Sequence, residues 1–317
     1  MADHILGRRD FLAASAWAAA SVPMARLAAF QTGPAEKRVP VVRVASDHVA
    51  RGRYIHAAVL AEMLDLTLTR LTARDTAAAA WRSLLRSDDL IGLKFNSSGA
   101  EAMATTEPFA DAVITSLLAA GYEERQIVAI EAPDAIYHTH GVLRPTRGWQ
   151  SRQTDFGSGQ DQLSAVLDQV TAIVNVPFLK THNIAGVTCS LKNLSHALVK
   201  HPARYHGNHC SPFIGDIVAA PQIRQKIRLN LVNALRVVFD KGPEPESAYT
   251  WDAGTLLGGI DPVATDSTGL DIINAQRLIH GFDPVDPTVS AVYLREAAKR
   301  NLGVYSRHQI ERIKLRI

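Results

Sequence analysis

Hydrophobic and polar positions follow two different rhythms along the chain, and each rhythm predicts one kind of element. Short, nearly continuous apolar runs rich in Val, Ile and Leu are typical of strands that are buried on both faces. They predict strands over residues 38–46, 88–96, 126–133, 172–180, 228–240 and 255–262. Apolar residues at helical spacing predict helices over residues 54–66, 76–85, 107–121, 161–170, 265–279 and 287–300. The alternation predicts an α/β fold, with a mainly parallel sheet covered by helices on both faces, in one body or two lobes.

Polar side chains stand at the carboxyl ends of these predicted strands. The ends read KFN (94–96), EAPD (131–134), LKTH (179–182), FDKGP (239–243) and GIDP (259–262). In open α/β sheets, ligands bind beyond the carboxyl ends of the strands. We therefore expect a binding site at this edge of the sheet, with charged and amide groups facing the ligand.

The segment after LKTH predicts a helix with one polar stripe. At about 100° per residue, a helix over 187–200 places four apolar residues on one side. The opposite side carries Cys189, Lys192, Asn193, His196 and Lys200, without an acidic residue. One interpretation is a solvated polar face. The other is an anion site near a helix start, where Lys180 and His182 arrive from the preceding strand.

Histidines and cysteine in the same region raise the question of a metal. His196, His206 and His209, near Cys210, are ligands that suit a transition metal ion. Their spacing matches no established zinc motif, since the chain has neither HExxH nor paired CxxC. A bound metal and ordinary hydrogen-bonding histidines both stay open. The two cysteines of the chain cannot supply an iron–sulfur cluster.

Several other functional classes are excluded or disfavoured by the sequence. The glycines of GTLLGG lack the spacing of a dinucleotide or phosphate-binding loop, and no GxSxG motif is present. The net charge of +3 is spread along the chain, so we expect no nucleic-acid partner. Among the acids, Glu131 stands at a strand end, whereas Asp261 precedes a proline and Asp266 can cap the next helix.

The N-terminus resembles a twin-arginine (Tat) export signal. Arg8 and Arg9 precede Phe11 and Leu12, and an Ala-rich run too short to span a bilayer follows. We expect a signal peptide over 1–30, a linker over 31–38 and a folded domain over 39–317. The mature chain would then lie in the periplasm or outside the cell, exported folded by the Tat machinery, with no stable membrane span. The alternative is an amphipathic first helix.

The motifs IGLKFN, AIVNVPFLKTH, CSLKNLSHALV, RYHGNH and GTLLGGIDPVATD occur in this order. Over residues 40–280 the chain resembles the family called domain of unknown function 362. The resemblance implies an α/β fold and a bacterial origin. Some relatives carry ferredoxin-type cysteine clusters that this chain lacks. It also implies a shared site at matching positions, namely Lys94, Asn96, Lys180, His182, Lys192, Asn193, His209, Asp261 and Asp266.

Two functional hypotheses follow. The first is an exported enzyme that acts on an anionic small molecule. In it, Lys180, His182 and Lys192 are catalytic, with His182 as the acid–base group. Further residues bind the substrate or an unidentified cofactor, namely Lys94, Asn96, Asn193, Asp261 and Asp266. A transition metal would be held by His196, His206 or His209. The second hypothesis is a non-catalytic periplasmic binding or carrier protein for an anion or a metal.

Overall fold

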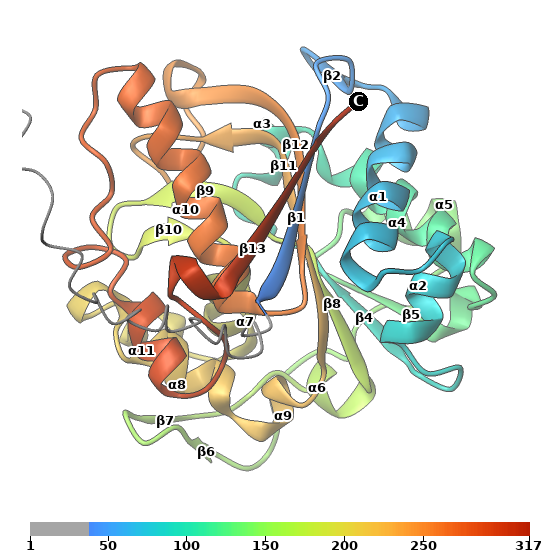
Figure 1. Cartoon of the computed structure of the whole chain (residues 1–317). Coiled ribbons are helices and arrows are strands. Elements are labelled where there is room, and N and C mark those ends of the chain that lie inside the picture. The colour runs from blue at the N-terminus through green and yellow to red at the C-terminus, as the bar shows by residue number, and fades with distance from the viewer. Residues whose placement is uncertain (1–37) are drawn as a thin grey trace, which may run out of the picture. The chain divides into compact units, whose positions relative to one another are not determined.

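A nine-stranded sheet forms the centre of the computed structural model, which describes residues 38–317. The strand order is β13-β1-β12-β11-β8-β4-β5, while β9 pairs with β11 and β10 pairs with β9 (Figure 1). The bounds are β1 Val39–Ala45, β4 Ile91–Lys94, β5 Ile127–Ile130, β8 Ala172–Asn175, β9 Phe178–His182, β10 Gly186–Thr188, β11 Ile227–Val238, β12 Thr250–Gly259 and β13 Ile310–Arg316. Two small hairpins stand apart, β2 (Ala50–Arg51) with β3 (Tyr54–Ile55) and β6 (Thr154–Asp155) with β7 (Gln160–Asp161).

The sheet is mainly parallel, as the sequence predicts. Strands β5, β4, β8 and β11 run parallel to one another, β9 runs parallel to β11, and β13 runs parallel to β1. Strand β12 is antiparallel to both of its neighbours, and β10 is antiparallel to β9. All residues of β4, β5, β8 and β9 are buried, which agrees with strands covered on both faces.

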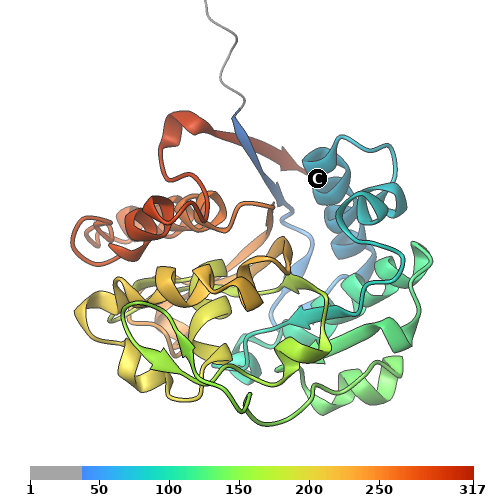
Figure 2. The same ribbon diagram turned by 90° about the horizontal axis from the view of Figure 1, so that it is seen from below.

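Helices cover both faces of the sheet and enclose two hydrophobic cores (Figures 1 and 2). One face packs against α1 (Ala57–Thr72), α2 (Ala77–Leu84), α4 (Thr106–Ala119) and α5 (Asp134–His140). The other packs against α6 (Val166–Gln169), α7 (Ser190–Ser195), α8 (Phe213–Ala219), α9 (Pro221–Arg224), α10 (Pro262–Ile279) and α11 (Tyr293–Lys299). A short helix, α3 (Ala100–Met103), follows β4. The α/β prediction is confirmed.

The described residues, 38–317, form one compact unit, so the two-lobe alternative is not seen in this part of the chain. The expected signal peptide and nearly all of the linker fall within residues 1–37, outside the described residues. Between residues 38 and 317, no helix combines the length and apolar character needed to cross a bilayer.

Several predictions from periodicity were wrong in detail, and the helix expected over 287–300 begins only at Tyr293. The strand expected over 172–180 is split into β8 and β9, and Pro177, which lacks a donor for the ladder, stands between them. The helix expected over 161–170 begins only at Val166, since Asp161 belongs to strand β7. Strand β13 was not predicted, because only every second or third of its residues is apolar and it pairs with β1 at an edge.

Candidate functional site

A pocket of about 300 Å³ lies at the carboxyl ends of β4, β5 and β9. Its wall includes residues 96–98 after β4, Glu131 after β5, and Lys180 and His182 of β9. Lys192, Asn193, His196 and His206 complete the polar part of the wall. Side chains that are far apart in the sequence therefore meet where the topology of the sheet favours a ligand.

The segment that positions Lys192 differs from the predicted helix over 187–200. Residues 186–188 form strand β10, because Val187 and Thr188 pair with Thr181 and Lys180 of β9. Helix α7 covers only Ser190–Ser195 and continues as the 3-10 helix η2 (His196–Leu198). Cys189 is consequently buried in the hydrophobic core instead of lying on a polar stripe beside Lys192.

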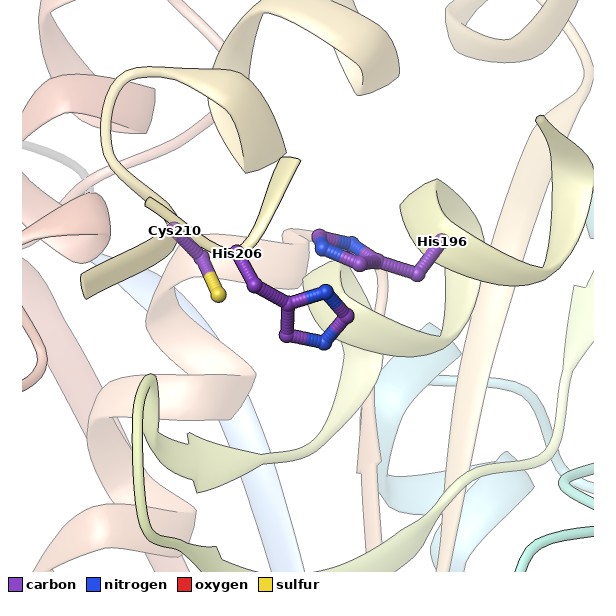
Figure 3. Close-up of side chains that lie close together, drawn as sticks. All are labelled: His196, His206 and Cys210. Atoms are coloured by element: carbon purple, nitrogen blue, oxygen red, sulfur yellow. The ribbon is translucent and has the colours of Figure 1, made fainter. Parts of the chain in front are cut away.

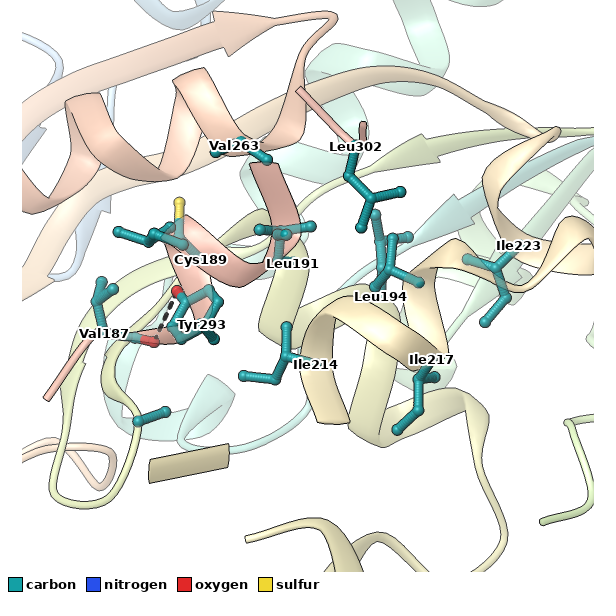
Figure 4. Packing of buried hydrophobic residues seen from close by; sticks show 14 of the residues in the cluster. Val187, Cys189, Leu191, Leu194, Ile214, Ile217, Ile223, Val263, Tyr293 and Leu302 are labelled. Atoms are coloured by element: carbon teal, nitrogen blue, oxygen red, sulfur yellow. Dashed lines mark hydrogen bonds between the residues drawn. The ribbon is translucent and has the colours of Figure 1, made fainter. Parts of the chain in front are cut away.

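Helix α7 is buried on all sides. Leu191 and Leu194 pack among Ile214, Ile217 and Leu302 (Figure 4). Lys192 is 8% exposed and Asn193 is 2% exposed. The interpretation of a solvated polar face is therefore wrong, and the polar residues of α7 face the pocket or the interior.

Asp266 of α10 holds the N-terminus of α7. Its carboxylate accepts hydrogen bonds from the N–H groups of Ser190 (2.6 Å) and Leu191 (3.1 Å) and from the hydroxyl of Tyr293 (3.2 Å). Complete burial raises its pKa to about 6, against the effect of these hydrogen bonds. Asp266 thus caps α7 rather than its own helix, and it does not line the pocket.

Asp261 is the N-cap of α10, the kind of turn and capping role that its position before Pro262 indicates. Its carboxylate accepts hydrogen bonds from the N–H groups of Ala264 and Val304, both at 2.8 Å. Burial raises its pKa. The structure therefore places both predicted aspartates in positions that support helices, away from the pocket wall.

Lys94 lies behind the pocket wall. Its fully buried ammonium donates to the carbonyl of Phe95 (2.6 Å), to Glu131 Oε2 (3.1 Å) and to Asn193 Oδ1 (3.2 Å). Burial lowers its pKa, and the Glu131 carboxylate acts in the opposite direction. Since all three protons have acceptors, Lys94 fixes Glu131 and Asn193 instead of offering a free charge to a ligand.

Buried asparagines extend this network across the sheet. Asn193 Nδ2 donates to Asn175 Oδ1 (2.7 Å), and Asn175 Nδ2 donates to Asn230 Oδ1 (2.9 Å) and to the carbonyl of Ser190 (3.1 Å). Asn175 and Asn230 were not among the residues predicted for the site. Their signal is a lone amide inside an otherwise apolar strand, which requires a buried hydrogen-bond partner.

Lys180 is the first cation that faces the pocket. Its side chain is fully buried, and its ammonium donates to the carbonyl of Ser98 at 2.8 Å. Burial lowers its pKa to about 8, while the Glu244 carboxylate raises it. Asn96 lines the same pocket, and its buried Oδ1 has no hydrogen-bond partner within residues 38–317.

His182 is neutral and carries its proton on Nε2. Its Nδ1 accepts hydrogen bonds from the N–H groups of Ile184 and Ala185, both at 3.1 Å. Burial, followed by the positive charge of Lys192, lowers its pKa to about 3. An imidazole in this state is a hydrogen-bond donor at Nε2. The sequence predicts His182 as the acid–base group, a role that usually calls for a pKa nearer to neutrality.

Lys192 is the second cation at the pocket. Its Nζ lies 3.3 Å from Nε2 of His206, and among residues 38–317 no carboxylate forms an ion pair with Lys180 or Lys192. Burial lowers the pKa of Lys192 to about 8, and Lys180 acts in the same direction. His206 Nδ1 is 3.1 Å from the carbonyl of Pro202, which fixes the proton on Nδ1.

His196, His206 and Cys210 bring three potential metal ligands within 4.8 Å of one another (Figure 3). Burial lowers the pKa of His196 to about 2 and also lowers the pKa of His206, so both rings are neutral. His209 lies apart from this group, since its Nδ1 contacts the carbonyl of Ile184 at 3.0 Å. Of the three histidines proposed from the sequence, the structure brings two together and adds Cys210.

The family assignment rests on a match over residues 90–271, a range that contains every residue of the pocket wall named above. The matching family is described as a domain of unknown function. No curated protein matches the chain. The match covers more than half of the sequence, and the chain belongs to the DUF362 family.

Proposed function

We propose that this protein is an enzyme that acts on a small organic anion, a carboxylate or a phosphate ester, bound in the pocket at the strand ends. The main support is the pair of buried ammonium groups, Lys180 and Lys192, which form no ion pair with a carboxylate of residues 38–317. Burying two like charges without a counterion is unfavourable, and a bound anion relieves that cost.

Each side chain at the pocket has a role in this proposal. Lys180 and Lys192 bind the anionic group, and His182 donates a hydrogen bond from Nε2. The unpartnered Oδ1 of Asn96 supports a substrate that also carries a donor, such as a hydroxyl or an amine. The volume of about 300 Å³ suits a small metabolite.

The preference for an enzyme over a carrier rests on Lys180. Its pKa of about 8 is close enough to neutrality for the amine to give and take a proton. This replaces His182 as the acid–base group.

Calorimetric titration with a panel of small carboxylates and phosphate esters tests the proposal. The wild type should bind at least one of them, and Lys180→Met and Lys192→Met should each weaken binding at least about tenfold. Lys200→Met is the matched control, because Lys200 is exposed and donates to Gln162 at the surface. The proposal of an anion site between these amines would be refuted if Lys200→Met lost affinity for the anion. It would also be refuted if both Lys180→Met and Lys192→Met kept the affinity of the wild type.

Turnover separates the two functional hypotheses. The ligand that binds most tightly is incubated with the wild type and followed by NMR. Conversion that is absent in Lys180→Met supports the enzyme. Tight binding without any conversion would identify the chain as a binding or carrier protein.

We further propose that the chain is exported folded by the Tat pathway to the periplasm or the cell exterior. The support is the arginine pair Arg8–Arg9 followed by Phe11, Leu12 and an Ala-rich run.

A further inference from the structure

We propose that His196, His206 and Cys210 form a binding site for a divalent transition-metal ion at the wall of the pocket. One ligand atom from each residue lies within 4.8 Å of the other two (Figure 3). Two imidazoles and one thiolate are a ligand set that suits borderline ions such as Zn²⁺ and Co²⁺. The inference goes beyond the anion site, since it uses neither Lys180 nor His182.

Hydrogen bonds prepare His206 for this role. Its Nδ1–H donates to the carbonyl of Pro202 at 3.1 Å, which leaves the lone pair of Nε2 free to coordinate. A backbone carbonyl on the opposite ring nitrogen is the usual partner of a metal-bound histidine. The Nδ1 atom of His196 contacts Ser195 Oγ (2.9 Å), and its Nε2 atom contacts the carbonyl of Tyr205 (3.2 Å). When a metal ion coordinates one of these two nitrogens, that nitrogen loses its hydrogen bond and the other keeps its own.

The backbone brings the thiol of Cys210 into the group at a conformational cost. Asn208, His209 and Cys210 have positive φ angles of 47°, 53° and 59°, although none of them is glycine. Such conformations are unfavourable for L-residues and cluster at functional sites. The turn buries the thiol of Cys210 next to His196 and His206, while it leaves the side chain of His209 outside the group.

Lys192 competes with the metal for the same lone pair. Its ammonium lies 3.3 Å from Nε2 of His206 and repels a cation at that position. The metal therefore binds only when the lysine side chain turns away from His206. His196 and His206 also line the pocket, so an ion held by them lies at the pocket wall.

Metal binding releases one proton. The ion accepts the lone pairs of two neutral imidazoles, and the S–H bond of Cys210 gives way to a metal–sulfur bond while its proton goes to the buffer. No oxidant or reductant takes part.

Cobalt titration under reducing conditions tests the site. One equivalent of Co²⁺ should produce visible d–d bands and a near-ultraviolet thiolate-to-cobalt band. Cys210→Ser should abolish the thiolate band, and His196→Ala or His206→Ala should weaken binding at least about tenfold. Cys189→Ser and His209→Ala are matched controls, a second buried cysteine and the histidine beside Cys210, and both should keep the full spectrum. Lys192→Met should bind cobalt more tightly.

X-ray absorption of the zinc-loaded wild type gives a test that needs no variant. The expected shell has one sulfur at about 2.3 Å and the remaining ligands nitrogen or oxygen. A shell without sulfur, no binding near equimolar metal, or a thiolate band that survives Cys210→Ser would overturn the proposal. Lys180→Met should lose anion binding but still bind cobalt, whereas Cys210→Ser should lose cobalt binding but still bind the anion. Each proposal can therefore be refuted without refuting the other.

Discussion

The ammonium group of Lys180 is buried and has one hydrogen-bond acceptor, the carbonyl of Ser98. The ammonium of Lys94, by contrast, has three acceptors, among them the Glu131 carboxylate. The two lysines therefore differ in function although both stand on strands that end at the same edge. Lys94 stabilises the wall of the pocket, whereas the ammonium group of Lys180 is available to bind an anion in the pocket.

Lys180→Met should make the protein more stable at neutral pH. The folded-state pKa of about 8 lies below the ordinary value of 10.5, so the folded protein carries a disfavoured charge at any pH below 8. This cost fades as the pH rises from 8 toward 10.5. We expect the free energy of unfolding to rise by about 1 to 3 kcal/mol at pH 7 and by almost nothing at pH 10.5. Urea unfolding at both pH values measures this change in the free energy of unfolding. A loss of stability at pH 7 would show that the charge of Lys180 is not disfavoured in the folded protein.

Anion affinity should fall as the pH rises through about 8, because only the protonated amines attract the ligand. Besides the effect of burial, Glu244 raises the pKa of Lys180, Cys210 raises and Lys180 lowers that of Lys192, and His182 stays neutral above its pKa of about 3. Binding should therefore be constant between pH 6 and 7. Calorimetry with a ligand whose own charge is fixed over this range measures the profile. Affinity that increases above pH 8 would exclude the lysines as the binding groups.

Lys94→Met should disrupt the pocket wall. It removes three hydrogen bonds, leaves Asn193 Oδ1 without its donor, and leaves Glu131 with hydrogen bonds from Ser97 but no countercharge. Removing one partner of a buried ion pair costs about 3 to 5 kcal/mol of stability. The cost is smaller here because Glu131 is partly exposed. We expect a loss of about 2 to 4 kcal/mol in urea unfolding, opposite in sign to Lys180→Met. Equal effects of the two variants would show that the lysines do not differ as described.

At the scale of elements, α7 depends on α10. The six residues of α7 are too few to form a stable helix alone, and its first N–H groups are bound by Asp266. The position of Lys192, Asn193 and His196 at the pocket therefore depends on a carboxylate 76 residues away from Ser190 in the sequence.

Asp266→Ala should destabilise the protein by about 2 to 3 kcal/mol, because two buried N–H groups lose their acceptor. Hydrogen exchange at Ser190 and Leu191 should accelerate. Asp261→Ala is the matched control, since it removes the N-cap of α10 and leaves the acceptor of α7 in place. Unchanged exchange in Asp266→Ala, or equal acceleration in both variants, would show that Asp266 does not anchor α7.

The sequence predicts those elements whose pattern is long or strongly apolar. Strands β4, β5 and β11 and helices α2, α4 and α10 lie close to their expected ranges. The region after β9 could not be predicted, because Val187 and Thr188 fit a helix periodicity and a strand equally. Their pairing with β9 and the anchor at Asp266 decide the outcome, and both are tertiary contacts.

The members of the site were more predictable than their chemistry. Strand ends identify Lys180, His182 and Asn96, and Lys192 follows from the absence of acids near it. The protonation state of His182 depends on two N–H donors in the next turn, and the burial of Lys94 depends on the packing of three strands. No pattern in the sequence contains either contact.

At the scale of the whole molecule, every residue of the pocket belongs to the one compact unit formed by residues 38–317. Replacing Arg8 and Arg9 together by lysine should leave that unit intact and prevent Tat export, since the receptor reads the arginine pair. Cell fractionation in a Tat-competent bacterium measures it. Equal amounts of the wild type and the variant in the periplasm would contradict the export proposal.

The most direct test of the account is a crystal structure of the complex with the anion that binds most tightly in calorimetry. The account predicts the anionic group within hydrogen-bond distance of Lys180 Nζ, Lys192 Nζ and His182 Nε2. It also predicts a donor of the ligand facing Asn96 Oδ1. A ligand bound elsewhere, with both amines in their present positions, would contradict the central claim that these two unpaired charges form the binding site.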